Sequence, residues 1–370
     1  MANSSSSAQA PVAAGQRAFP ELTQNLQDFI AQPGADDSAF NSLALQLFAH
    51  QVQHNAAYGR FCRARGRTPA TVRRWQDIPA VPVNGFKELT LSCLPPEQCE
   101  RVFTTSGTTR EVKGRHFHPD LQVWNASMRR HFADCVGPLP MRMGILFPSE
   151  AEMPNSSLAH YLQLALQDHG LPGSRHLMSE QGLDSEALLA LVHQAQSDQQ
   201  PLALLGATYS FVHLMDAMAG AGLRLPAGSW LLDTGGFKGR SREIPMEAFY
   251  AQLSGTFGVQ RERCINMYGM TELSTQWYDA GNATLPSIKQ GPHWIRWRLI
   301  DPVTGRDVPA GEEGIVVHCD LANYNAVTTI LTEDVGVAAG DGFKLLGRAQ
   351  GSQAKGCSIA VDQFLKASQS

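Results

Sequence analysis

The chain has 370 residues, of which 43% are hydrophobic and 17% are charged, and its formal net charge is −4 at pH 7. This length and composition allow a buried core and exceed what one ordinary domain needs. The charge balance offers no basic excess that would attract nucleic acid or an anionic membrane.

The first residues and the cysteines are typical of a cytoplasmic protein. Residues 1–20 are rich in Ser, Ala and Gln, without the charged start and apolar run of a secretion signal, so we expect a disordered tail. No stretch is apolar for long enough to span a bilayer. The seven cysteines show no CxxC motif and no zinc-ligand spacing. Cys93 and Cys99 could pair, but free thiols in a reducing compartment are the simpler interpretation.

Strands and helices alternate through most of the chain. The series begins with an amphipathic helix over 42–62, followed by proline-rich turns and a short apolar stretch at 101–104. Further along, the pattern predicts strands at 143–147, 202–206, 229–233 and 264–268, and helices at 156–169, 186–196, 210–219 and 245–253. This alternation indicates an α/β fold, a mainly parallel sheet with helices on both faces. Ligands bind such sheets at the carboxyl ends of the strands, so the loops that follow strands are candidate sites.

The sequence changes character after residue 290. Segments 294–300 and 314–319 are predicted strands, and turns at 301–305 and 309–314 separate them. We therefore expect a disordered tail over residues 1–20, an α/β core over 21–290, and a small β-rich lobe with a short C-terminal segment over 291–370.

A polar loop follows the apolar stretch at 101–104. It consists of Thr104, Thr105, Ser106, Gly107, Thr108 and Thr109. Because glycine permits tight curvature, backbone N–H groups and hydroxyls there can converge on phosphate oxygens. Lys113 and Arg115, on either side of Gly114, could neutralise phosphate charge. The loop is not a Walker motif, and alone it is explained equally well as an ordinary polar loop.

Two further motifs follow predicted strands. Gly235 and Gly236 come after the strand at 229–233, where a plain turn is the simplest interpretation. The segment from Tyr268 through Gly269 and Met270 to Thr271 and Glu272 is more informative. It offers an aromatic ring that can stack on a base, a hydroxyl for a phosphate, and a carboxylate of the kind that binds Mg²⁺.

Charged residues and a thiol follow in the β-rich lobe. Asp334 could chelate a ribose diol, and Arg348 could reach the same ribose or a phosphate. Cys357 lies two positions after Lys355, whose charge would lower the pKa of the thiol and favour the thiolate. In isolation, a solvated charge is the better explanation for Asp334 and for Arg348. Cys357 alone would be a small buried hydrophobic side chain, as most cysteines are.

The order of these motifs carries more information than any one of them. The hydroxyl loop, 268–272, 332–334 and 347–348 occur in the order typical of the adenylate-forming superfamily of acyl-CoA synthetases. Within it, the chain resembles the acyl-protein synthetase family (LuxE type) of bacterial bioluminescence fatty-acid reductases. The similarity spans roughly residues 78–365, is weakest over 121–201, and also includes 78–83, Phe86-Lys87, 234–238, 268–276 and 341–357.

The resemblance implies an ATP-dependent ligase. Such an enzyme uses ATP and Mg²⁺ to convert a carboxylic acid, here a fatty acid, to acyl-AMP, moves the acyl group to a cysteine near its C-terminus, and supplies an acyl reductase partner. Cys357 occupies the position of that cysteine. By the same resemblance, phosphates would be held by Ser106, Gly107, Thr108 and Thr109, the adenine by Gly235, Gly236 and Tyr268 beside Gly269, phosphate and Mg²⁺ by Thr271 and Glu272, and the ribose by Asp334 and Arg348.

The sequence departs from the family pattern in one loop and from the larger superfamily at its end. Arg110 stands where the family usually has glycine, which affects how the loop closes over pyrophosphate. The mobile C-terminal domain of the superfamily, with its catalytic lysine, is largely absent, as it is in acyl-protein synthetases. Another cation must then offset charge at the reacting carboxylate, and Lys238, Lys113 and Lys355 are the candidates.

Two alternatives remain open from the sequence. The acid could be small or aromatic, with CoA, a carrier protein or a reductase as acceptor, because the apolar stretch 202–218, taken as the acyl lining, does not fix the length of the acid. The chain could instead be an inactive nucleotide-binding scaffold for a reductase. The complete set of Thr271, Glu272, Asp334 and Arg348 weighs against the scaffold.

Overall fold

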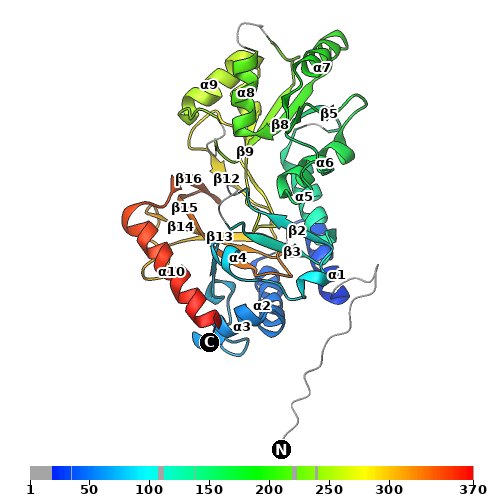
Figure 1. The fold of residues 1–370 in the computed structure, drawn as a ribbon. Helices are drawn as coiled ribbons and strands as arrows, with labels where there is room; N and C mark the ends of the chain where they lie inside the picture. Colours follow the sequence, from blue (N-terminus) through cyan, green and yellow to red (C-terminus); the bar gives the residue numbers. More distant parts are fainter. Residues whose placement is uncertain are drawn as a thin grey trace, which may run out of the picture.

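The computed structural model describes residues 19–34, 36–106, 112–137, 139–218, 223–237 and 241–369. In these ranges the chain forms two six-stranded sheets and two small two-stranded sheets, with helices packed around them (Figure 1).

The first large sheet has the strand order β11-β10-β9-β8-β4-β5. Its strands are β4 (Arg142–Leu146), β5 (Arg175–His176), β8 (Leu202–Ala207), β9 (Trp230–Thr234), β10 (Cys264–Tyr268) and β11 (Trp277–Tyr278). All neighbours from β5 to β10 are parallel, and the edge strand β11 is antiparallel to β10. Every residue of the central strand β8 is buried, as expected for a parallel strand covered on both faces. The predicted mainly parallel α/β sheet is confirmed.

Helices cover both faces of this sheet. They are α5 (Gln122–Cys135), α6 (Ser157–His169), α7 (Ser185–Ser197), α8 (Thr208–Ala217) and α9 (Met246–Phe257). Successive side chains of a strand point to opposite faces. Ala203 and Leu205 therefore join the core beneath α5 and α6, while Leu202 and Leu204 join the core beneath α7, α8 and α9. The helices predicted in this region are all present, with ends shifted by a few residues.

The second large sheet is mainly antiparallel and has the order β12-β16-β15-β14-β13, with β1 paired in parallel to β15. Its strands are β1 (Val81–Pro82), β12 (Ile288–Lys289), β13 (Ile295–Ile300), β14 (Glu313–Asp320), β15 (Thr329–Ala339) and β16 (Gly342–Arg348). The two strands predicted here, at 294–300 and 314–319, correspond to β13 and β14. Because β1 and β12 come from before residue 290, this sheet is not built from one continuous segment, and the division at residue 290 stays a prediction.

Four helices pack around the second sheet, α1 (Pro20–Ala31), α2 (Asp37–His54), α3 (Ala56–Ala64) and α10 (Gly351–Gln369) (Figure 1). The prediction of one helix over 42–62 was wrong. Asn55 separates α2 from α3 in an extended conformation, and its side chain accepts a hydrogen bond from the Tyr58 N–H at 3.2 Å. Asparagine is a strong N-cap because its short side chain satisfies a free N–H of the next helix. The C-terminal segment, for which no helix was predicted, forms α10, and Phe364 packs on Phe61 of α3.

Short elements complete the chain. The small sheets pair β2 (Arg101–Thr104) with β3 (Arg115–His118) and β6 (Met178–Ser179) with β7 (Gly182–Leu183); α4 (Gly85–Glu88) and 3₁₀ turns at Trp75–Asp77, Pro96–Gln98 and Arg261–Arg263 connect other elements. Over the described ranges, no helix has the length and apolar character needed to cross a membrane. All seven cysteines lie in described segments and are free thiols, so Cys93 and Cys99 are not joined.

Candidate active site

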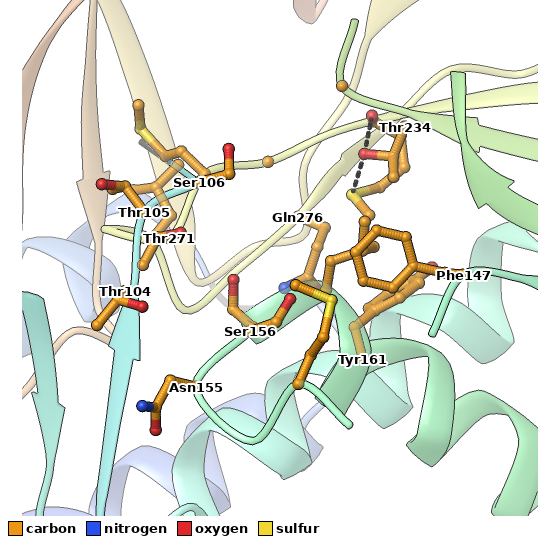
Figure 2. Close-up of a pocket in the computed structure, with 18 of the residues that line it drawn as sticks. Thr104, Thr105, Ser106, Phe147, Asn155, Ser156, Tyr161, Thr234, Thr271 and Gln276 are labelled. Carbon is orange, nitrogen blue, oxygen red and sulfur yellow. Dashed lines mark hydrogen bonds between the residues drawn. The ribbon is translucent and has the colours of Figure 1, made fainter. Parts of the chain in front are cut away.

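A cavity of about 340 Å³ opens where the parallel strands of the first sheet end (Figure 2). Phe147 follows β4, Tyr209 follows β8, Thr234 ends β9, and Gly269 follows β10, and all four line the cavity. The Thr234 hydroxyl donates to the Met267 carbonyl at 2.9 Å, which ties the ends of β9 and β10 together. The cavity therefore occupies the position at which parallel α/β sheets bind ligands.

One end of the cavity is lined by hydroxyl groups. Thr104, Thr105 and Ser106 approach it from the end of β2, and Thr271 approaches from the loop after β10 (Figure 2). Lys113 lines the same end. Clustered hydroxyls with a nearby ammonium group suit an anion such as a phosphate.

Hydrogen bonds between Thr105, after β2, and Gly114, before β3, position the start of the hydroxyl loop. The Thr105 N–H donates to the Gly114 carbonyl at 3.0 Å, and the Gly114 N–H donates to the Thr105 hydroxyl at 2.9 Å. The expected phosphate residues Gly107, Thr108 and Thr109 lie outside the described residues, as does Arg110.

Glu272 lies beside Gly114 and is only 5% exposed. Burial raises its pKa to about 7, while the positive charges of Lys87 and Arg348 act in the opposite direction. A Cβ on Gly114 would come within 3.2 Å of the Glu272 Oε1 atom, so a glycine at this position leaves space for the carboxylate next to the hydroxyl loop.

The surroundings of Glu272 suit a Mg²⁺ ion that is bound together with a phosphate. Within the described segments, no group of three or more His, Cys, Asp or Glu side chains could hold a metal by itself. Mg²⁺ commonly uses one or two carboxylates and completes its shell with phosphate oxygens and water. A single buried carboxylate beside a hydroxyl-lined anion site is consistent with an ion that arrives with a phosphate.

Tyr268, Asp334 and Arg348 form a second cluster where the two sheets meet. The Tyr268 hydroxyl donates to Asp334 Oδ2 at 2.8 Å. Arg348 is paired with Asp334 across β15 and β16, and its guanidinium lies 3.4 Å from Asp334 Oδ1 and 2.6 Å from Glu333 Oε2. Burial raises the pKa of Asp334, while the Tyr268 hydrogen bond and the Arg348 charge oppose that rise. The structure thus brings together the three residues expected at the ribose and adenine.

The expected site residues are not all placed alike. Those that line the cavity are Ser106, Gly235, Gly269 and Thr271. The described residues that line the cavity do not include Glu272, Tyr268, Asp334, Arg348 or Gly236. Lys238 falls outside the described ranges. Of the three candidate cations, Lys113 lines the cavity and Lys355 is exposed on α10.

Asp320 of β14 stabilises the loop that carries Thr271 and Glu272. Its buried carboxylate accepts hydrogen bonds from the Ser274 and Thr275 N–H groups, each at 2.9 Å, and from the Thr275 hydroxyl at 2.7 Å. Asn323 adds a bond of 2.8 Å from its amide to the Glu272 carbonyl. Sequence analysis missed both residues, because nothing local marks a carboxylate or amide that satisfies a distant loop.

The other end of the cavity is apolar and aromatic. Phe147 and Tyr161 lie on the side away from Ser106 (Figure 2), and Trp124, Met153 and Leu158 are further apolar residues of the cavity lining. The expectation that 202–218 forms this lining was wrong, since Tyr209 is the one residue of that stretch among the described lining residues. The other buried apolar residues of 202–218 belong to the sheet core, because β8 is a central strand and α8 packs onto it. Most of the described apolar residues that line this cavity come from 121–201, where the family resemblance is weakest.

Two buried polar atoms in the described lining of the cavity have no hydrogen-bond partner among the described residues. They are Gln276 Oε1 and Trp124 Nε1, and both are buried in residues that line the cavity. Gln276 is 6% exposed, and Figure 2 shows it in the cavity together with Phe147 and Tyr161. An unpaired buried polar atom is unfavourable, so these two mark places where a ligand can supply the missing partner. The sequence offered no signal for either.

Cys357 lies on α10, away from the described lining of the cavity. It is 5% exposed and packs among Ile300, Val317, Leu331 and other apolar side chains. Burial raises the pKa of its thiol to about 11. The expectation that Lys355 lowers this pKa was wrong, because Lys355 is exposed and burial dominates.

Comparisons with known proteins identify the family and the fold of the chain. The model of the family described as acyl-protein synthetase, LuxE, matches residues 32–366. The chain is 22% identical over 335 residues to the long-chain-fatty-acid–luciferin-component ligase of Vibrio harveyi, covering 86% of each chain. It is 21% identical over 343 residues to the ligase of the same name from Aliivibrio fischeri, covering 88% of each.

Among solved structures, an open conformation of 2-hydroxyisobutyryl-CoA ligase in complex with 2-HIB-AMP and CoA superposes with a TM-score of 0.63 at 15% identity, over 84% of this chain and 74% of that one. The same ligase in the thioesterification state gives a TM-score of 0.61 at 17% identity, over 84% and 68%. These similarities show the fold of the adenylate-forming ligases. The chain therefore belongs to the acyl-protein synthetase family, LuxE, and is a ligase.

Proposed function

We propose that this ligase activates a fatty acid with ATP and Mg²⁺ to acyl-AMP, and then transfers the acyl group to Cys357 for delivery to an acyl reductase. The observation that carries the proposal is the cavity, whose hydroxyl end and apolar end meet at the carboxyl ends of the parallel strands. The first end suits phosphates and the second suits the hydrocarbon part of an acid.

In the first reaction, a carboxylate oxygen of the acid attacks the α-phosphorus of ATP. A new carboxyl O–P bond forms, the bond to the bridging oxygen breaks, and pyrophosphate leaves. Ser106 and Thr271 donate hydrogen bonds to the phosphate oxygens, and Lys113 offsets their negative charge. Glu272 would hold Mg²⁺, which when bound supplies further neutralisation of phosphate charge.

In the second reaction, the thiolate of Cys357 attacks the acyl carbonyl of the adenylate. A C–S bond forms, the C–O bond to AMP breaks, AMP leaves, and the thiol proton goes to solvent. Because Cys357 packs in an apolar cluster and does not line the described cavity, the thiol must leave its resting position to reach the adenylate.

A second candidate is activation of a short or aromatic acid, with CoA or a carrier protein as acceptor. The modest cavity volume, about 340 Å³, and the aromatic rings of Trp124, Phe147, Tyr161 and Tyr209 favour it. The two candidates differ in the acid that is activated and in the thiol that receives it.

Intact mass measurement tests the proposal. The protein is incubated with Mg·ATP and a panel of fatty and aromatic acids, with and without neutral hydroxylamine, which cleaves thioesters. We expect a hydroxylamine-labile gain that maps to Cys357 and whose mass identifies the acid. Pyrophosphate release without any gain in mass would move the acceptor to CoA or a partner protein.

Variants separate the two reactions. Glu272→Gln should lose pyrophosphate release, while Cys357→Ser should keep it and lose the stable acyl-enzyme. Cys135→Ser, at a half-buried thiol outside both sites, is the matched control and should keep both. A thioester that still forms in Cys357→Ser would rule out the assignment of the acyl site.

A further inference from the structure

We propose that a second cavity, beneath α10, holds the acyl chain while it is bound to Cys357 as a thioester. The inference rests on the proposed acyl transfer to Cys357 and adds a binding site for the hydrocarbon chain of the intermediate. It follows from where the thiol lies, what lines the adjacent cavity, and what a fatty acyl thioester requires.

The second cavity has a volume of about 890 Å³ and lies between α3, β1, the 302–305 turn and α10. Its buried lining is mainly apolar and includes Phe61, Ile78, Ile300, Val317 and Leu331, with Thr329 as a buried polar residue among them. Its outer lining includes the exposed side chains of Arg65, Arg67 and Val303. An apolar interior behind a polar rim is the usual form of a site for a hydrocarbon ligand.

Cys357 packs directly behind the residues that line this cavity. Ile300, Val317 and Leu331 line the cavity and also form the cluster in which the thiol is packed. Ala360, one helical turn after Cys357 on α10, lines the cavity as well. An acyl chain attached to the Cys357 sulfur can therefore enter the cavity by displacing side-chain contacts at its wall.

The neighbouring residue Gly356 supports this placement. A Cβ added to Gly356 would lie 2.9 Å from Pro302 Cγ and 3.2 Å from Val303 Cγ2, and both Pro302 and Val303 line the cavity. The helix turn that carries the thiol thus rests directly on the cavity rim. Val303 is 69% exposed at this rim.

A fatty acyl thioester has two needs that this cavity meets. Its chain is apolar, so leaving it in water is unfavourable. Its carbonyl is open to hydrolysis unless water is excluded. The cavity beneath α10 is also larger than the 340 Å³ cavity at the strand ends, so a long chain has more space beside the thiol than beside the hydroxyl loop.

Filling the cavity tests the inference. Ala360→Phe adds a ring at the cavity wall, while Asp362→Phe adds the same ring at an exposed position of α10 that is not among the residues lining the cavity, as the matched control. Each variant is loaded with a fourteen-carbon or a four-carbon acid, and the lifetime of the acyl-enzyme is followed by intact mass.

We expect Ala360→Phe to shorten the lifetime of the fourteen-carbon thioester about fivefold or more, because water gains access to it. In Ala360→Phe the four-carbon thioester and ATP–pyrophosphate exchange should be unchanged, and the Asp362→Phe variant should behave as the wild type. Equal lifetimes for both chain lengths in Ala360→Phe would overturn the inference.

A second experiment tests the inference without substituting a residue of the cavity lining. The wild-type protein is loaded with a fatty acid that carries a diazirine near its methyl end, irradiated, and digested. We expect cross-links at 61–82 or 298–305, and their loss in Cys357→Ser. The same cross-links in Cys357→Ser would assign the cavity to free acid and overturn the thioester role.

The two proposals fail in different ways. If the diazirine acyl group is attached to Cys357 but all of its cross-links lie near Phe147 and Tyr161, this inference is overturned and the proposed acyl transfer stands. A wild-type protein that releases pyrophosphate but never carries a label on Cys357 overturns the acyl transfer, and this inference with it.

Discussion

The Tyr268 hydroxyl donates a hydrogen bond of 2.8 Å to Asp334 Oδ2. The bond joins β10, which ends at the cavity, to β15, which is paired with the strand that carries Arg348. Tyr268 ends β10 of the first sheet, and Asp334 lies in β15 of the second. This bond therefore links the two sheets at the place where the nucleotide is expected. It also stabilises the ionised form of a carboxyl whose pKa burial raises.

Tyr268→Phe should weaken nucleotide binding more than it weakens the fold. Losing the hydrogen bond should lower the free energy of unfolding by about 1 kcal/mol. Asp334 would lose the donor that orients it, so we expect KM for ATP to rise several-fold with a smaller change in kcat. Steady-state pyrophosphate release and urea unfolding measure the two effects.

Tyr250→Phe is the matched control for that variant. The buried Tyr250 hydroxyl donates to Asp233 Oδ1 at 2.7 Å, a bond of the same kind, and Tyr250 is not among the described residues that line the cavity. We expect a similar loss of stability and an unchanged KM for ATP. If the two variants have the same KM for ATP, the ribose assignment of Asp334 is wrong.

Asp320→Asn should destabilise the protein through the loop it supports. The amide would turn an N–H₂ donor toward groups that now donate to the carboxylate, among them the N–H groups of Ser274 and Thr275. Buried unpaired donors of this kind should lower the free energy of unfolding by about 2 kcal/mol. Urea unfolding measures this loss.

Asp301→Asn provides the comparison for Asp320→Asn. Asp301 accepts two backbone N–H bonds of 2.8 Å, from Val303 and Thr304, but in an exposed turn where water can replace a lost partner. We expect a loss of no more than about 0.5 kcal/mol. Equal losses in the two variants would contradict the supporting role of Asp320.

The sequence predicted the parallel sheet well because its signals are local. The strand at 264–268 was predicted with the bounds that β10 has, and the helix at 156–169 differs from α6 by one residue. A buried strand is a short apolar run, and a helix start is marked by a capping serine such as Ser156, whose hydroxyl accepts the Ala159 N–H bond.

The lining of the site and the state of the thiol depend on contacts that sequence spacing does not show. Phe147 and Tyr161 reach the cavity from β4 and α6, whose sequences alone indicate only that they are buried. The sequence argument for Lys355 and Cys357 failed for a related reason. Residues two apart on a helix point in different directions, so the lysine faces solvent while the thiol faces the core.

Gln276→Leu should separate stability from substrate binding. In the free protein, Gln276 Oε1 is buried without a partner, so replacing it with an apolar group of similar size should leave the unfolding temperature equal or higher. If the acid supplies the missing partner, KM for the acid should rise several-fold while KM for ATP stays constant. An unchanged KM for every acid in the panel would show that Gln276 does not contact the substrate. Thermal unfolding and pyrophosphate release measure the two quantities.

Cys357 should react slowly with iodoacetamide in the resting protein, and its reaction should speed up when the substrates are present. Burial raises the pKa of this thiol to about 11, and only the thiolate reacts. The rate of modification, followed by peptide mapping, should therefore rise about tenfold per pH unit from pH 8 to 9.5 without a plateau.

The same peptide in urea is the control for this pH profile, because an exposed thiol with an ordinary pKa near 8.5 levels off in that range. Adding a fatty acid analogue that cannot form a thioester, together with Mg·ATP, should accelerate the native reaction if Cys357 leaves its apolar cluster to meet the adenylate. A rate that already levels off near pH 8.5 in the resting protein would contradict the buried position of the thiol. A rate that substrates do not change would contradict the movement that the proposed transfer requires.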